Sequence, residues 1–110
     1  FELLAVKESP YQRVRVVAGE GLRFLQVNEA SNSFQSAWQP EPGLLAGNFY
    51  FNDFALPYWW QAESPKIWRV LCIGMGAGTA KRVLEGTLPT SVDLAFTGIE
   101  LDPVVTELAK

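Results

Sequence analysis

Histidine is absent from the 110-residue chain, and cysteine occurs only once. Without histidine, the chain lacks the usual acid–base group near neutral pH and the commonest protein ligand of metals. With a single cysteine, Cys72, it can form neither an internal disulfide nor a two-cysteine metal site. We therefore expect no metal, and we expect Cys72, which lies in an apolar run, to be a buried strand residue.

Excess charge and long apolar runs are also missing. The net charge of −3 gives no electrostatic reason to bind nucleic acid. No apolar run reaches the ~18 residues that a membrane span needs, and no charged-then-apolar leader opens the chain. We therefore expect a cytoplasmic protein that contacts neither membrane nor nucleic acid. Because the chain starts at Phe1 and stops at Lys110 within a helical pattern, we interpret it as a piece of a longer protein.

Apolar residues are plentiful, at 48% of the chain, and aromatic residues make up 13%. This content supports one modest core and leaves aromatic surface to meet another subunit or missing sequence. We expect a homodimer. The aromatic cluster 58–60 is interpreted as core or subunit contact rather than as a stacking platform.

The first part of the chain, residues 1–43, predicts an antiparallel β-unit of three or four strands. Residues 11–17 alternate between polar and apolar, which places Arg13 and Arg15 on a solvated face. A glycine-containing turn precedes the apolar run 22–27, and a further short strand is expected near Phe34. Residues 44–66 predict a helix, which Pro57 must kink or end, and a connecting loop.

The second part, residues 67–110, changes to a β-α-β pattern. Strands are expected at Ile67–Ile73 and Val92–Leu101, with a helix at Thr79–Glu85 between them. Asp102 is expected to cap a second helix that begins at Pro103.

A glycine loop, Gly74-Met75-Gly76-Ala77-Gly78, joins the first of these strands to its helix. Glycine allows the backbone to turn sharply and a ligand to approach it closely. Glu100 lies 22 residues beyond Gly78, at the end of the next strand, where parallel pairing would bring its carboxylate to the loop and to both ribose hydroxyls. The alternative is a tight turn without a ligand.

Two other nucleotide-binding loops fit less well. A dinucleotide-binding loop would have glycine at the position of Thr79, and a phosphate loop would need a Gly-Lys-Ser/Thr sequence that the chain lacks.

Residues 70–79 and 98–105 together resemble the spermidine synthase-like family, and residues 9–16 are similar to the strand that opens the family's β-domain. The resemblance implies an α/β fold in which a small antiparallel β-unit precedes the first β-α-β of a Rossmann-like domain. It also implies S-adenosylmethionine or its decarboxylated form as co-substrate, and alkyl transfer to a small-molecule amine.

The resemblance also implies where the ligands are bound. The nucleoside would contact Gly74, Met75, Gly76, Gly78, Glu100, Leu101 and Gln12. The amine pocket would include Tyr50 and Asn32. Two departures, Ala77 and Phe51, replace polar residues that grip cationic substrates in the family. The catalytic base would follow a later strand, so the catalytic residues stay unassigned.

Three functions are compatible with this pattern. The first is an aminopropyltransferase, the second is a methyltransferase that uses S-adenosylmethionine itself, and the third is a non-catalytic nucleoside-binding or assembly module.

Overall fold

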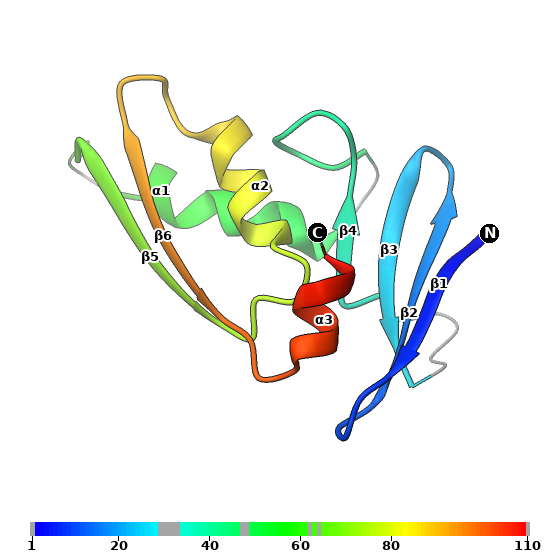
Figure 1. The fold of residues 1–110 in the computed structure, drawn as a ribbon. Helices are drawn as coiled ribbons and strands as arrows, with labels where there is room; N and C mark the ends of the chain where they lie inside the picture. The colour runs from blue at the N-terminus through cyan, green and yellow to red at the C-terminus, as the bar shows by residue number, and fades with distance from the viewer. Residues whose placement is uncertain (1, 29–33, 47–48, 62, 64, 110) are drawn as a thin grey trace.

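The computed structural model describes residues 2–28, 34–46, 49–61, 63 and 65–109. The chain forms a four-stranded antiparallel sheet and a two-stranded parallel sheet, with short helices around them (Figure 1). The elements are β1 (Glu2–Glu8), β2 (Arg13–Gly19), β3 (Leu22–Val27), β4 (Ser36–Trp38), the 3-10 helix η1 (Tyr50–Ala55), α1 (Leu56–Trp59), β5 (Ile67–Ile73), α2 (Thr79–Thr87), β6 (Asp93–Ile99) and α3 (Pro103–Leu108). The expected mixture of an antiparallel β-unit and a β-α-β unit is confirmed.

The antiparallel sheet has the strand order β1-β2-β3-β4. Glu20 and Gly21, with φ angles of 55° and 78°, form the two-residue turn between β2 and β3. Positive φ at both positions is the geometry that matches the twist of a tight hairpin. The expected short strand near Phe34 begins two residues later, at Ser36.

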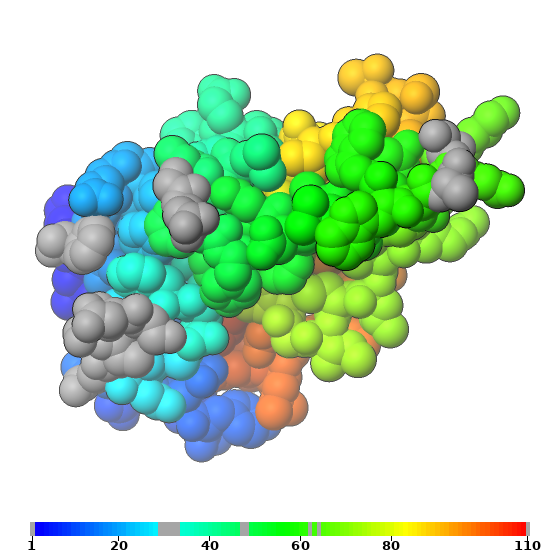
Figure 2. All heavy atoms as spheres, turned by 180° about the vertical axis from the view of Figure 1, so that it is seen from behind, coloured from blue at the N-terminus to red at the C-terminus, as the bar shows by residue number. Residues whose placement is uncertain are grey.

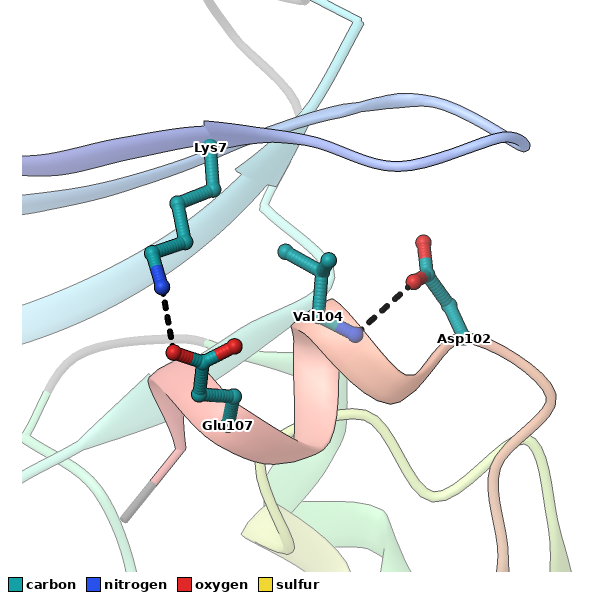
Figure 3. Close-up of polar contacts among 4 residues, drawn as sticks. All are labelled: Lys7, Asp102, Val104 and Glu107. Carbon is teal, nitrogen blue, oxygen red and sulfur yellow. Dashed lines mark hydrogen bonds and ion pairs between the residues drawn. The ribbon is translucent and has the colours of Figure 1, made fainter.

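Both faces of this sheet are covered. One face packs against η1 through a cluster in which Phe24 and Phe51 are almost fully buried. The other face packs against α3, where Val14, Leu25 and Val105 form a second cluster. An ion pair between Lys7 on β1 and Glu107 on α3 also connects this helix to the sheet (Figure 3). The antiparallel sheet therefore lies between η1 on one face and α3 on the other.

The β-α-β unit pairs β5 with β6 in parallel, from Ile67 opposite Asp93 to Ile73 opposite Ile99. Helix α2 connects the two strands (Figure 1). Because the strands are parallel and in register, their carboxyl ends meet at one edge, where the glycine loop and Glu100 follow.

The helix expected from Leu44 does not begin there. Helical structure starts at Tyr50 as a 3-10 helix and changes to α-helix at Leu56. The Asn52 side chain accepts a hydrogen bond from the backbone N–H of Leu45 at 2.7 Å and donates one to its carbonyl at 3.1 Å, which holds that segment in a non-helical form. Pro57 lies in the first turn of α1, where its missing N–H costs no hydrogen bond.

Three burial predictions can be compared with the structure. Cys72 is half-buried rather than buried, because the face of β5 that it shares with Trp68 and Val70 is itself only partly covered. In the aromatic cluster 58–60, Tyr58 is buried, whereas Trp59 and Trp60 are 57% and 77% exposed, and for these two a subunit contact stays a prediction. Arg15 is half-buried rather than solvated, and it donates a hydrogen bond to the Gln26 side chain at 3.0 Å.

Seen from behind, segment 49–61 lies on the surface between the strands of the antiparallel sheet and β5 (Figure 2). None of the helices in the described ranges has both the length and the apolar character needed to cross a membrane.

Candidate functional site

The glycine loop adopts a backbone that side chains disfavour. Gly74, Gly76 and Gly78 have φ angles of 76°, 56° and 82°, all in the left-handed region. Residues with a Cβ atom pay a steric penalty there, so glycine is the residue of choice at each position. The N–H groups of Gly74 and Met75 both donate to the Ile99 carbonyl, at 2.7 and 3.1 Å. The loop is thereby folded over the end of β6.

Glu100 bridges this loop to the start of α3. One of its carboxylate oxygens accepts a hydrogen bond from the N–H of Gly76 at 3.0 Å, and the other accepts one from the N–H of Asp102 at 3.0 Å. The carboxylate therefore lies beside the loop, as the parallel register predicts. That it binds a ribose stays a prediction.

Asp102 is almost completely buried next to Glu100. One oxygen accepts the N–H of Val104 at 3.0 Å, which confirms the predicted helix cap (Figure 3). The other oxygen accepts the Ser9 hydroxyl at 2.6 Å and the Gln12 amide at 3.0 Å. Residues from the turn between β1 and β2 thus meet residues that follow β6.

These contacts determine the ionisation of Asp102. Burial acts to raise the pKa of its carboxyl group, because the charged form loses hydration. Hydrogen bonds from two side chains and from backbone N–H groups outweigh burial and hold the pKa below its ordinary value. Asp102 is therefore a carboxylate at neutral pH.

Ser36 and Thr79 are site residues that the sequence reasoning missed. The Ser36 hydroxyl accepts the N–H of Ala77 at 2.9 Å. The Thr79 hydroxyl accepts the N–H of Ala37 and donates to its carbonyl, both at 3.0 Å. Strand β4 is thus attached to the loop and to the first turn of α2. No local signal marks Ser36 for this role, because the contact spans 41 positions.

The space beside Gly76 also differs from expectation. A Cβ atom there would lie 2.5 Å from the Ser36 hydroxyl oxygen, so a protein side chain occupies the place where a nucleoside was expected to approach. At Gly74 a Cβ atom would meet nothing within 4 Å. Of these two glycines, Gly74 is the one open to a ligand.

Met75 and Leu101, two further predicted nucleoside contacts, differ in exposure. Met75 is half-buried and covers Gly98, where a Cβ atom would fall within 3.1 Å of three Met75 side-chain atoms. Leu101 is 73% exposed.

The predicted amine pocket is not assembled around Glu100 in the described residues. Tyr50 is 61% exposed, and its described ring contacts are with Phe51 and Phe54. Phe51 is 2% exposed and belongs to the core, which accounts for an apolar residue at that position. Asn32 lies outside the described residues.

A cavity of about 380 Å³ lies on the α3 side of the antiparallel sheet. Ser36 and Ala77 contribute to its wall, together with Arg23, Trp38 and Leu108, whereas Glu100 and Gln12 do not. The Arg23 guanidinium is stacked over the Trp38 ring at 5.2 Å. Within the described ranges, no group of three or more metal-binding side chains is close enough to hold a metal ion.

No protein-family model, curated protein or solved structure matches the chain with statistical significance.

Proposed function

We propose that the edge formed by Gly74, Glu100 and Gln12 binds the adenosine part of an S-adenosylmethionine-type nucleoside. The observation that carries this proposal is the Glu100 carboxylate, which is hydrogen-bonded at 3.0 Å to the N–H of Gly76 in a loop of left-handed glycines. A carboxylate at the end of the second strand of a β-α-β unit is well placed to accept ribose hydroxyls.

Glu100 retains the capacity to accept further hydrogen bonds. A carboxylate offers about four lone-pair sites. Two of them take the N–H groups of Gly76 and Asp102, one on each oxygen. One site per oxygen is left, which is enough to accept a ribose hydroxyl, so the backbone contacts orient the carboxylate without saturating it.

The activity that we propose is alkyl transfer from the sulfonium nucleoside to an amine, within a spermidine synthase-like, Rossmann-like transferase. The support for it is the resemblance of the glycine-loop and Glu100 segments to that family. A methyltransferase that uses S-adenosylmethionine itself has the same nucleoside requirement. The base that would deprotonate the amine is not assigned to any residue of this chain.

A non-catalytic assembly module is the second candidate, and the contact between Ser36 and the loop favours it. With the Ser36 hydroxyl 2.5 Å from the Cβ position of Gly76, close packing alone accounts for glycine there. In this alternative the loop attaches the antiparallel sheet to the β-α-β unit, and no nucleoside binds.

Calorimetric titration with S-adenosylmethionine and with its decarboxylated form tests the proposal. In the Glu100→Gln variant we expect about tenfold to a hundredfold weaker binding of whichever nucleoside the wild type prefers, because hydrogen bonds to a charged acceptor are lost. Glu85→Gln is the matched control, since Glu85 is exposed on α2 and lies far along that helix from the loop.

A ligand-side comparison separates ribose recognition from damage to the loop. The wild type should discriminate strongly against the 2′,3′-dideoxy form of the preferred nucleoside, and Glu100→Gln should discriminate little. Equal affinity of the wild type for the two forms, or no binding of either sulfonium nucleoside, would reject the proposal and leave the assembly module.

A further inference from the structure

The buried Asp102 carboxylate controls which atoms of Gln12 face it. An ionised carboxylate can only accept hydrogen bonds, whereas a carboxamide has one donating end and one accepting end. The amide nitrogen of Gln12 donates to Asp102 at 3.0 Å. The carboxamide is planar, so this contact turns its oxygen away from Asp102.

The same aspartate is also linked to Glu100. Its backbone N–H donates to the second Glu100 oxygen at 3.0 Å. Its side-chain carboxylate accepts a hydrogen bond from the Ser9 hydroxyl. The hydroxyl oxygen of Ser9 in turn accepts hydrogen bonds from the backbone N–H groups of Tyr11 and Gln12, both at 3.1 Å. Gln12 is therefore fixed through its backbone and through its side chain, next to the residue that holds Glu100.

We infer that Asp102 is a positioning residue that makes Gln12 present its amide oxygen to the ligand, so that the site selects a sugar hydroxyl that donates a hydrogen bond. This inference rests on the proposed nucleoside site. The low pKa of Asp102 is consistent with it, because a protonated carboxyl group could donate and would allow the Gln12 amide to turn over.

The probes for the test are S-adenosylmethionine and its 2′-deoxy-2′-fluoro and 3′-deoxy-3′-fluoro analogues. Fluorine is similar in size to a hydroxyl group, but it donates no hydrogen bond. The wild type should bind the parent nucleoside about tenfold more tightly than the analogue altered at the hydroxyl that meets Gln12. The other analogue is altered at the hydroxyl that meets Glu100. It serves as the internal control, because the contact with Glu100 does not depend on the orientation of the Gln12 amide.

The Asp102→Asn variant should reduce discrimination at the Gln12 position to about twofold, while discrimination at the Glu100 position persists. Asparagine is a good helix cap, so α3 is retained. The Q12E/D102N double variant should restore the discrimination, because the amide introduced at position 102 then donates to the carboxylate introduced at position 12, and an acceptor again faces the ligand. Asp93→Asn, which changes an exposed aspartate on β6, is the matched control.

Nuclear magnetic resonance of the Gln12 side-chain amide provides a readout that does not depend on the ligand. Its NH₂ signals should move strongly in Asp102→Asn and remain in place in Asp93→Asn. Unchanged signals would overturn the positioning role whether or not a nucleoside binds.

The titrations have two further outcomes of their own. If Asp102→Asn weakens all three probes equally, Asp102 only supports the fold and the inference is wrong. If the wild type binds none of the probes, the proposed function fails, and the selection of a sugar hydroxyl fails with it.

Discussion

Gly76 lies where two restrictions on a side chain coincide. Its φ angle of 56° is left-handed, and a Cβ atom would come within 2.5 Å of the buried Ser36 hydroxyl. Gly74 and Gly21 share the first restriction, with φ angles of 76° and 78°, but have nothing within 4 Å of a Cβ atom. Substitutions at these three glycines can therefore distinguish the energetic cost of the left-handed backbone from the cost of the contact with Ser36.

We expect alanine at Gly74 or Gly21 to lower the free energy of unfolding by about 1–2 kcal/mol, which is the steric cost of the left-handed conformation. Alanine at Gly76 should cost about 1 kcal/mol or more beyond that, because the Ser36 side chain must also move. Urea denaturation of the three variants measures the difference. Equal losses would mean that the Ser36 contact does not constrain the loop.

The residues of the site differ in how far the sequence predicts them. Glu100 could be placed beside the loop, because parallel pairing and its position after β6 follow from local patterns. Asp102 could be predicted as a helix cap, because an aspartate followed by a proline is also a local pattern. Ser36 could not, because its contact depends on how two units separated along the chain pack together. The roles of Tyr50 and Asn32 rest on the resemblance alone, and they stay predictions.

At the scale of elements, the Thr79 side chain of α2 makes two hydrogen bonds to the backbone of β4. The Thr79 hydroxyl satisfies both backbone groups of Ala37, in the way that a neighbouring strand would. Both residues are buried. Water therefore has little access to replace these bonds if the hydroxyl is removed.

Valine at Thr79 keeps the shape of the side chain but removes both hydrogen bonds. We expect a loss of about 1–3 kcal/mol in the free energy of unfolding, because two buried backbone groups lose their partner. Thr106→Val, at an exposed position of α3, should change stability by less than about 0.5 kcal/mol. A near-neutral Thr79→Val would show that β4 is held in place by its apolar contacts instead.

The strands, and the helices of the β-α-β unit, could be predicted to within about two residues, because their apolar periodicity and their caps are local. The start of the helix expected from Leu44 could not be predicted, because the helical spacing of apolar residues does not show which side chains bind the backbone instead. Asn52 uses its side chain to bind the backbone of Leu45 in a non-helical arrangement. Side chains of this type compete with helical hydrogen bonds, and the competition is decided by packing.

At the scale of the whole molecule, the two-stranded sheet leaves large apolar side chains in contact with water. Leu71, Ile73 and Ile99 are 62%, 79% and 52% exposed on one face, and Leu101 beyond them is 73% exposed. We expect exposed apolar surface of this kind to pack against another protein surface.

We expect the 110-residue chain to associate as its concentration rises, with sedimentation velocity as the measurement. Threonine at both Ile73 and Leu101 should weaken the association, because apolar surface is removed without disturbing the buried core. Lys81→Gln, an exposed change on α2, should leave the association unaltered. A wild type that sediments as a monomer at every concentration would show that this face needs no partner.

The contacts of Ser9 with Asp102 and of Ser36 with Ala77 join positions 93 and 41 residues apart. Closing such long spans is entropically slow, so these contacts form after the local hairpins and helices. During translation the strands of the antiparallel sheet leave the ribosome well before residue 102 does. The corner where Gln12, Glu100 and the glycine loop meet can therefore form only after residue 102 has emerged, so a nascent chain has its sheet before it has this corner.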